Sequence, residues 1–368
     1  MRIGLAGAGR IGARHAAALC ELPEVEALVV ADADPSRARD LAARLRAGPA
    51  CGRAAGRRPD DAAAVDVRAA GSVADLFGEG PPGSALDGLD ALDGLDALVV
   101  TAATDAHAAL VERGVRARIP VFCEKPLAAD LDGTFHIVRS ARAAGVPVQV
   151  GFQRRFDAGH IAAREAVSAG RLGRLHTVRS CSFDATPPPP GYVPASGGLF
   201  RDCAIHDLDA IRHVTGRNVA WVMAAGSDRG GEVFRACGDV DTGAALLGLD
   251  DGTLCTIGAG RYNAAGYDVR LELFGSEDSI VAGLDDRTPV TPVPEPAPGP
   301  ARPPAYAGFL DRFAAAYDAE LRAFVDVVAG RRTNPCPPEE ALEAFYLAEA
   351  CEISRREGRV VHPEEVRL

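Results

Sequence analysis

A carboxylate and an imidazole lie four residues apart at Asp202 and His206, within residues 197–212. On an α-helix, side chains with this spacing share one face. An imidazole titrates near neutral pH and can take a proton from an alcohol, while a neighbouring carboxylate orients the ring. The spacing therefore predicts a general base, His206, with Asp202 as its partner. Because most helical His and Asp side chains are solvated or structural, the pair needs further catalytic parts elsewhere in the chain.

The composition is that of a globular protein with more than one domain. Its 368 residues exceed the usual size of a single hydrophobic core, and 47% hydrophobic with 25% charged residues can bury a core without a membrane-like composition. Forty basic against 51 acidic side chains give a formal net charge of -11, which repels phosphate backbones and anionic membranes. We expect a small-molecule ligand, and neither nucleic acid nor a membrane as partner.

The cysteines and the termini indicate a cytoplasmic protein. Nine cysteines without a C-x-x-C pair predict reduced thiols rather than a disulfide framework or a zinc site. We find no export signal and no apolar run of about 18 residues that could span a bilayer. The cysteines and the eight histidines form no cluster with ligand spacing, so no metal is expected.

The opening residues have the order of a dinucleotide-binding unit. A short apolar strand over residues 2–6 precedes the turn Gly7-Ala8-Gly9-Arg10-Ile11-Gly12 and a helix. Gly7 permits a tight turn, Gly9 lets the backbone approach a pyrophosphate, and Gly12 lets helix and strand pack closely. The helix N-terminus provides an anion site. Arg10 and Ile11, which begin that helix, are therefore predicted among the cofactor-binding residues.

A second apolar strand, residues 28–31, ends at Asp32. A carboxylate at this point can bind both hydroxyls of the adenosine ribose. Because Asp32 would repel a 2′-phosphate, the sequence favours NAD over NADP. Arg37 and Arg39 lie just beyond and leave the strength of that preference open.

Two later strands lead into polar segments. Residues 97–101 run into Thr104-Asp105-Ala106-His107, and residues 121–123 into Glu124-Lys125-Pro126. Ligands of open parallel sheets bind at the carboxyl edge of the strands, where both segments fall. Most lysines are simply exposed, but the following proline fixes the backbone of this one. Four residues of these segments are predicted to bind the cofactor: Thr104, His107, Glu124 and Lys125.

Two segments in the first half are predicted as surface insertions. Residues 48–61 are rich in Gly, Arg and Pro, and residues 86–97 form a short repeat of Leu, Asp, Gly and Ala. The repeat lacks the twelve-residue pattern of a calcium loop, so its aspartates are expected to be solvated.

These motifs resemble those of the Gfo/Idh/MocA oxidoreductases, and the resemblance covers nearly the whole chain. Many members of that family have a proline before the histidine that matches His107, whereas this chain has Ala103, as some inositol dehydrogenase-like members do. The expected fold is an α/β Rossmann-like N-terminal domain with a parallel sheet over residues 1–150. An α+β C-terminal domain with a large, mainly antiparallel sheet is expected over residues 151–368.

Three stretches of the second half resemble inositol dehydrogenases. In Gly151-Phe152-Gln153-Arg154-Arg155-Phe156-Asp157, Gln153 and Arg154 can donate hydrogen bonds to a hydroxyl-rich ring, although consecutive arginines equally suit ion pairs. Residues 202–209 resemble the same stretch of the inositol dehydrogenases, and within them Asp202 and His206 look like the family's substrate-side carboxylate and histidine. Residues 266–272 contain Tyr267, which the resemblance places near substrate, although a tyrosine in a sheet usually packs.

The remaining second half alternates strands and helices. We expect a helix over residues 160–168, a strand over 175–183, a helix that ends at Gly216, and an antiparallel sheet over 219–283. Amphipathic helices over residues 309–329 and 338–356 are expected to pack rather than to carry chemistry. The resemblance implies that the sheet joins four copies into a homotetramer.

Together these parts predict an NAD-dependent, inositol 2-dehydrogenase-like enzyme that oxidises a secondary hydroxyl of a cyclitol, such as myo-inositol or an aminocyclitol. His206 would remove the hydroxyl proton, Asp202 would orient His206, and Lys125 would stabilise the charge on the reacting oxygen. Two alternatives stay open: a dehydrogenase of a hexose or sugar derivative, and an NAD-sensing regulatory protein without catalysis. A sensor needs none of these three residues, which argues against it.

Overall fold

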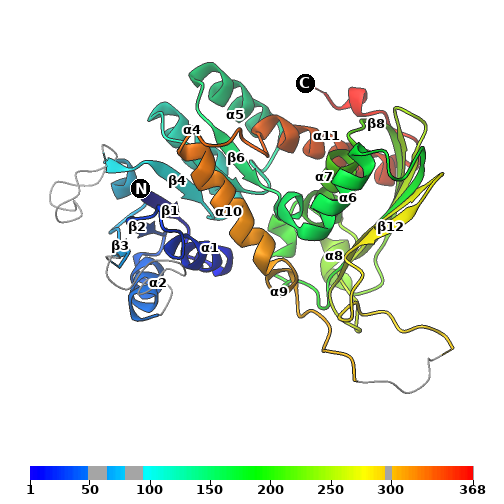
Figure 1. Cartoon of the computed structure of the whole chain (residues 1–368), viewed down its shortest axis with the longest axis horizontal. Helices are drawn as coiled ribbons and strands as arrows, with labels where there is room; N and C mark the ends of the chain where they lie inside the picture. The colour runs from blue at the N-terminus through cyan, green and yellow to red at the C-terminus, as the bar shows by residue number, and fades with distance from the viewer. Residues whose placement is uncertain (49–63, 79–93, 295–300, 368) are drawn as a thin grey trace. The chain divides into compact units, whose positions relative to one another are not determined.

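The computed structural model describes residues 1–48, 64–78, 94–294 and 301–367 (Figure 1). Its contacts divide the chain into two compact units. Unit 1 comprises Met1–Phe152 and Tyr317–Leu342, and unit 2 comprises Gln153–Ala316 and Glu343–Leu368. Most of both predicted insertions lies outside the described residues.

Unit 1 is built on a six-stranded sheet in which every pairing is parallel, in the order β3-β2-β1-β4-β5-β6. This order confirms the Rossmann-like prediction. Apolar runs form these strands because both faces of the sheet are covered by helices. The strands are β1 (Arg2–Ala6), β2 (Ala27–Ala31), β3 (Asp66–Ala69), β4 (Ala97–Val100), β5 (Val121–Glu124) and β6 (Val148–Gly151).

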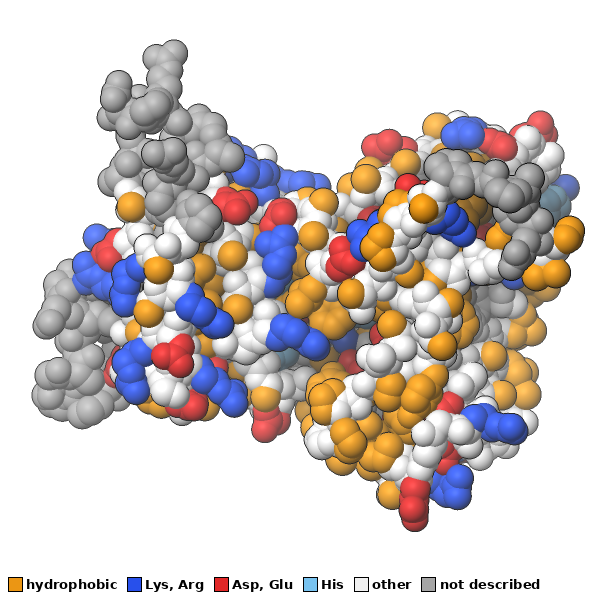
Figure 2. Space-filling view, turned by 90° about the horizontal axis from the view of Figure 1, so that it is seen from below, with side chains coloured by type: hydrophobic (Ala, Val, Ile, Leu, Met, Phe, Trp, Pro, Cys, Tyr) orange, Lys and Arg blue, Asp and Glu red, His pale blue; other side chains and the backbone are white. Residues whose placement is uncertain are grey.

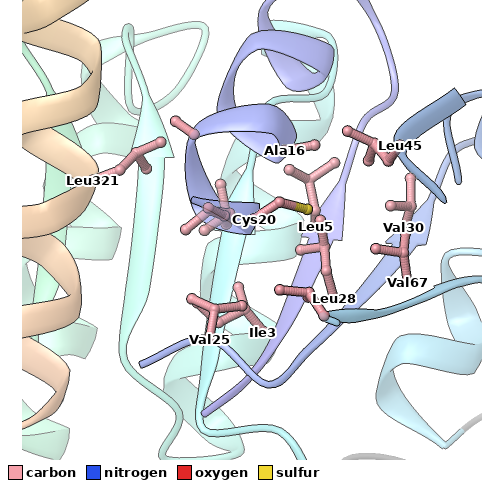
Figure 3. Packing of buried hydrophobic residues seen from close by; sticks show 14 of the residues in the cluster. Ile3, Leu5, Ala16, Cys20, Val25, Leu28, Val30, Leu45, Val67 and Leu321 are labelled. Atoms are coloured by element: carbon pink, nitrogen blue, oxygen red, sulfur yellow. The ribbon is translucent and has the colours of Figure 1, made fainter. Parts of the chain in front are cut away.

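Helices cover the two faces of this sheet. Side chains of β1, β2 and the helices α1 and α2 point toward one another in a dry core (Figure 3). On the other face, Gly114 lets its helix approach closely, because a Cβ there would lie 2.5 Å from Val121 and 3.3 Å from Leu98. The helices are α1 (Arg10–Cys20), α2 (Pro35–Ala47), η1 (Ala74–Phe77), α4 (Thr104–Arg116) and α5 (Leu131–Ala144).

A late helix returns to this core. From Tyr317 onward, α10 (Ala314–Val328) belongs to unit 1, and its Leu321, Phe324 and Val325 are buried in the same hydrophobic cluster as residues of β1 and α1. Figure 3 shows Leu321 within this cluster. The sequence assigned this helix to the second half, because amphipathic spacing predicts a buried face but not which core receives it. The division into two folding domains at residue 150 stays a prediction.

Unit 2 holds a mixed sheet in the order β12-β11-β7-β10-β9-β8. Only β7 and β10 pair in parallel, and the other pairings are antiparallel. This confirms the mainly antiparallel sheet, with β7 added at its centre. The strands are β7 (Leu175–Phe183), β8 (Val219–Ser227), β9 (Thr242–Leu249), β10 (Leu254–Gly260), β11 (Asp268–Gly275) and β12 (Ser279–Ala282).

The two faces of this sheet differ in burial. The helices α6 (Ala158–Ser168) and α7 (Ile205–Thr215) lie against the sheet, and one of its faces is mostly buried. Along the register, a buried row crosses the sheet through Val222, Leu247, Cys255, Val178 and Leu273. The neighbouring row on the opposite face is mostly exposed and runs through Met223, Leu246, Thr256, Arg179, Glu272 and Val281.

The remaining elements of the described residues are short, apart from one long helix. The helix α7 ends at Gly216, whose φ of 66° confirms the predicted left-handed cap. None of the described helices is long and apolar enough to cross a membrane. On the face shown in Figure 2, acidic and basic side chains of the described residues are interspersed. These elements are η3 (Gln153–Phe156), η4 (Val193–Ala195), η5 (Phe200–Ala204), α8 (Glu232–Ala236), α9 (Phe309–Arg312), α11 (Pro338–Glu357) and η6 (Pro363–Glu365).

The return of α10 makes a testable prediction about stability. Phe324→Ala should lower the free energy of unfolding by about 3–5 kcal/mol, because it leaves a cavity in the core of unit 1. Arg322→Ala, at an exposed position of the same helix, should change it by about 0.5 kcal/mol or less. Urea denaturation followed by circular dichroism measures both. Equal effects of the two substitutions would contradict the packing of α10 on unit 1.

Candidate active site

Two residues of the turn, Gly7 and Gly12, must be glycine because neighbouring backbone atoms leave no room for a Cβ. Gly7 has a φ of +110°, and a Cβ on it would lie 2.5 Å from the backbone of Thr101. A Cβ on Gly12 would lie 1.9 Å from the carbonyl oxygen of Gly7. Thr101 Oγ1 donates to the same carbonyl at 2.7 Å and ties the turn to the end of β4. These contacts confirm the structural roles predicted for Gly7 and Gly12.

Gly9 faces open space, which suits a dinucleotide. It is exposed, and a Cβ built on it would meet no atom within 4 Å. It is also the N-cap of α1, and no side chain caps this helix end. The positive end of the helix dipole, at Arg10 and Ile11, therefore suits an anion such as a pyrophosphate.

Asp32 braces the turn from the end of β2. Its Oδ2 accepts a hydrogen bond from the backbone N–H of Ala8 at 2.7 Å, and its Oδ1 accepts from Asp34 N–H at 2.9 Å. Each carboxylate oxygen keeps a further lone pair for a ribose hydroxyl. A surface pocket beside the turn is lined by Ala8, Arg37, Asp40, Ala43 and Arg44.

His107 connects the ends of two strands. Its Nδ1 lies 2.8 Å from the carbonyl oxygen of Pro126, and its Nε2 lies 3.0 Å from that of Ala102. The buried ring thus joins the segment after β4 to the segment after β5. Thr104, also predicted to bind the cofactor, is the half-buried first residue of α4. The contacts of His107 therefore position the cofactor edge of the sheet.

The Glu124 carboxylate is directed into unit 1. Its Oε1 lies 2.6 Å from His15 Nε2, and its Oε2 accepts a hydrogen bond from the backbone N–H of Lys125 at 3.3 Å. Lys125 itself is half-buried and joined to Pro126 by a cis peptide bond. The sequence predicted Glu124 beside the cofactor, and the structure gives its carboxylate a role in holding the Lys125 backbone.

The pair that the sequence singled out lies on an irregular helix in unit 2. Residues Phe200–Ala204 form a π-helical turn, and α7 follows from Ile205. Because a π-turn is wider than an α-turn, the four-residue spacing of Asp202 and His206 does not by itself put them on one face. His206 is half-buried in the first turn of α7.

Asp202 is held by two residues that the sequence analysis missed. Arg261 Nη2 donates to Asp202 Oδ2 at 2.7 Å, and Tyr192 Oη donates to Oδ1 at 3.0 Å. Arg261 is buried and also donates to Asp184 Oδ2 at 3.2 Å. These charge-assisted hydrogen bonds favour the ionised form of Asp202. Arg261 follows β10 without any motif, so only the fold brings it to Asp202.

Both consecutive arginines of the Gly151–Asp157 segment make buried ion pairs. Arg154 donates to Asp207 Oδ1 at 2.9 Å and to Ser182 Oγ at 2.7 Å. Arg155 contacts both carboxylate oxygens of Asp209, from Nε at 3.0 Å to Oδ2 and from Nη2 at 2.5 Å to Oδ1. Of the two roles open to these arginines, the structure shows the ion pairs, and a substrate contact of Arg154 stays a prediction.

The other two predicted substrate residues are also buried in unit 2. Gln153 begins η3 and is 3% exposed, and Tyr267 precedes β11 and is 8% exposed. Burial raises the pKa of Tyr267, while the nearby charge of Arg154 lowers it less. Tyr267 therefore keeps its hydroxyl proton and can donate a hydrogen bond.

Two family models match successive parts of the chain. Residues 1–152 match the family described as "Oxidoreductase family, NAD-binding Rossmann fold", and residues 160–281 match the GFO/IDH/MocA C-terminal domain. The chain is 37% identical over 363 residues to myo-inositol dehydrogenase Hyg17 of Streptomyces leeuwenhoekii, covering 98% of this chain and 99% of the relative.

Solved structures show the same relationship. A myo-inositol dehydrogenase of Corynebacterium glutamicum superposes with a TM-score of 0.81 at 31% identity, covering 98% of both chains. A scyllo-inositol dehydrogenase of Lactobacillus casei, solved with NAD(H) and scyllo-inositol, gives a TM-score of 0.77 at 25% identity, covering 99% of both chains. Unit 1 of this chain thus carries an NAD-binding Rossmann fold, whose cofactor fits the open glycine turn and Asp32.

The glycine turn yields a prediction that separates binding from folding. Gly9→Ala should leave the melting temperature unchanged, since its methyl group enters open space, but should weaken NAD binding at least about tenfold. One lost hydrogen bond to a charged phosphate accounts for this, at about 1.5 kcal/mol or more. Gly12→Ala should lower the melting temperature itself, because its Cβ collides with Gly7. Calorimetric titration with NAD measures the first effect, and wild-type affinity in Gly9→Ala would refute the assignment.

Proposed function

The chain belongs to the Gfo/Idh/MocA family of oxidoreductases, and we propose that it oxidises a secondary hydroxyl of a cyclitol to the ketone. The proposed substrate is myo-inositol or a close relative such as an aminocyclitol. Likeness over nearly the whole chain to dehydrogenases named for myo-inositol and scyllo-inositol supports this substrate class. The proposed reaction uses three residues, Lys125, Asp202 and His206.

The proposal rests mainly on Lys125. It is the single lysine of the chain, and all the rest of the 40 basic residues are arginines. A guanidinium is always charged, planar and forked, whereas an ammonium is compact and can exchange a proton near the pH at which enzymes work. The chain thus has arginine at all its remaining basic positions but an ammonium at the carboxyl edge of its NAD-binding sheet. The presence of lysine at this one position favours chemistry at the substrate oxygen.

In the proposed mechanism, His206 removes the proton of the reacting hydroxyl. Asp202, kept ionised by Arg261 and Tyr192, stabilises the imidazolium that forms. Lys125 donates a hydrogen bond to the same oxygen and stabilises its developing negative charge. When bound, the nicotinamide supplies the acceptor for the hydride.

The remaining polar residues are proposed to recognise the ring. Gln153, Arg154 and Tyr267 offer amide, guanidinium and phenol donors to the hydroxyls that do not react. Because Arg154 is already held by Asp207 and Ser182, its donors are fixed in direction before substrate binds. Such preorganised donors select a hydroxyl pattern rather than only a ring size.

A substrate panel tests the function. The protein is mixed with NAD and, separately, with inositol isomers, aminocyclitols and hexoses, and the absorbance of reduced nicotinamide is followed. We expect turnover with at least one cyclitol. Turnover with hexoses alone would assign the enzyme to sugars, and tight NAD binding with silence across the panel would favour a sensor. NADP replaces NAD in a parallel series, where we expect lower efficiency because Asp32 repels the 2′-phosphate.

Substitution of the three proposed catalytic residues gives a second prediction. Lys125→Ala, Asp202→Asn and His206→Ala should each lower turnover at least about a hundredfold. Lys125→Arg should not restore it, because a guanidinium cannot replace the ammonium. The control is Asp326→Asn, which removes a partly exposed carboxylate of α10. Near-normal turnover in any of the three would remove that residue from the mechanism.

We further propose that four copies associate through the exposed face of the sheet in unit 2. Four large apolar side chains on its strands are exposed by 38–47%, although buried positions would suit them better. A second copy would cover them. They are Met223, Leu246, Leu254 and Val281.

This assembly makes its own prediction. Leu246→Asp should shift the protein from a tetramer to a smaller species, because an unpaired carboxylate in a covered apolar face is costly. Arg171→Asp, at an exposed position outside the sheet, is the control. Light scattering after size exclusion measures the mass, and a monomeric wild type would refute the proposal.

A further inference from the structure

Three ionisable side chains from distant parts of the sequence meet inside unit 1. His15 comes from α1, Glu124 from the end of β5, and Glu320 from α10. One nitrogen or oxygen atom of each lies within 4.8 Å of the other two. His15 and Glu320 are fully buried, and Glu124 is 9% exposed. Glu320 has no role in the proposed mechanism, so its burial needs another explanation.

We propose that Glu320 is a positioning residue for Lys125: as a buried neutral acid beside Glu124, it leaves the Glu124 carboxylate in place. Glu124 in turn holds the Lys125 backbone. The consequence for catalysis rests on the proposed function of Lys125, whereas the state of the cluster does not.

The surroundings of Glu320 disfavour its ionised form. Neither of its carboxylate oxygens has a hydrogen-bond partner among the described residues. A buried carboxylate without partners costs several kcal/mol, so such a group takes up a proton instead. Burial and the charge of Glu124 both raise its pKa well above the ordinary value, and the charge of Arg14 lowers it less.

The other groups packed around the cluster do not neutralise it. Arg14 of α1 is paired with Asp318 of α10 at 2.6 Å. The rings of Phe122 and Tyr317 pack on His15 with centroid distances of 5.3 and 5.6 Å. Gln149 of β6 donates to the backbone carbonyl of Glu320 at 3.0 Å and leaves the carboxyl group alone.

The distances in this cluster fit a hydrogen bond between His15 and Glu124 better than a bound metal ion. Two ligands on one tetrahedral ion, with bonds of about 2.0–2.2 Å, lie about 3.3 Å apart. His15 Nε2 and Glu124 Oε1 are only 2.6 Å apart, which is the distance of a charge-assisted hydrogen bond. The imidazole and the Glu124 carboxylate are therefore joined directly by a hydrogen bond. A second ionised carboxylate beside it would repel Glu124, and a protonated Glu320 does not.

The link to Lys125 runs through the other oxygen of Glu124. That oxygen, Oε2, accepts a hydrogen bond from the backbone N–H of Lys125 at 3.3 Å. On the other side of Lys125, His107 Nδ1 lies 2.8 Å from the carbonyl oxygen of Pro126. The loop is thus held on both sides of Lys125. Ionisation of Glu320 would displace Glu124 and release one of these two contacts.

Two substitutions of similar volume test the proposal in the full-length protein. Glu320→Gln copies the shape of the protonated acid, and Glu320→Met fills a similar volume; neither side chain can ionise. Asp326→Asn on the same helix is the matched control. Because Lys125 is the single lysine, its acylation by an amine-reactive reagent can be followed by mass spectrometry of one peptide, independently of turnover.

We expect Glu320→Gln to match the wild type in Lys125 acylation and in turnover near neutral pH. Glu320→Met should match it as well, because it too places no charge beside Glu124. At a pH above the raised pKa of Glu320, Lys125 of the wild type should acylate at least about threefold faster than Lys125 of either variant, because ionised Glu320 displaces Glu124 and the loop loosens. The pH dependence of stability has a definite sign. A pKa raised above the ordinary 4.5 makes the wild type lose stability as pH rises above about 4.5. The urea midpoint of Glu320→Gln relative to wild type should therefore rise with pH, and that of Asp326→Asn should stay constant.

Three outcomes would overturn the proposal. A constant difference between Glu320→Gln and wild type across pH would show that Glu320 does not hold a proton. Equal Lys125 acylation in the wild type and Glu320→Met above the raised pKa of Glu320 would show that the cluster does not position the loop. Stoichiometric zinc or manganese in the wild type, lost in both Glu320 variants, would assign a metal site. If the wild type oxidises no cyclitol, the acylation and stability measurements still decide the proposal.

Discussion

Two buried arginine–aspartate pairs fix the helix that carries the proposed base. Arg154 and Arg155 reach Asp207 and Asp209, and all four side chains are buried. Taking such charges out of water costs several kcal/mol per ion, so the arrangement is stable only while each hydrogen bond is made. Because Asp207 directly follows His206, these pairs set the direction of the first turn of α7. Asp202 is fixed separately, by Arg261 and Tyr192.

Unit 1 uses buried polar contacts in the same way. Thr101 holds the glycine turn, Asp32 braces Ala8, and His107 ties the loop after β5 to the loop after β4. Several side chains that the sequence assigned to ligands thus also hold backbone in place. A reacting oxygen must meet its proton acceptor and hydrogen-bond donor within narrow limits of distance and angle, so rigid supports serve both units.

The sequence predicted the parts of the fold that local patterns determine. Apolar runs that end at glycine or at polar residues marked β1, β2 and β5. Gly216 marked the end of α7, because the chain there takes a left-handed backbone conformation that favours glycine. Arg261 escaped prediction, since it meets Asp202 only because the fold brings β10 against η5. Likewise, no local pattern reveals which core receives α10, and no spacing joins His15, Glu124 and Glu320.

The central claim is that Lys125 and His206 act on the same hydroxyl oxygen. The most direct measurement is a crystal structure of the protein with NAD and the cyclitol that it turns over best. We expect the oxygen of one secondary hydroxyl within about 3.2 Å of both Lys125 Nζ and a ring nitrogen of His206. A bound cyclitol in which no hydroxyl contacts both residues would contradict the account.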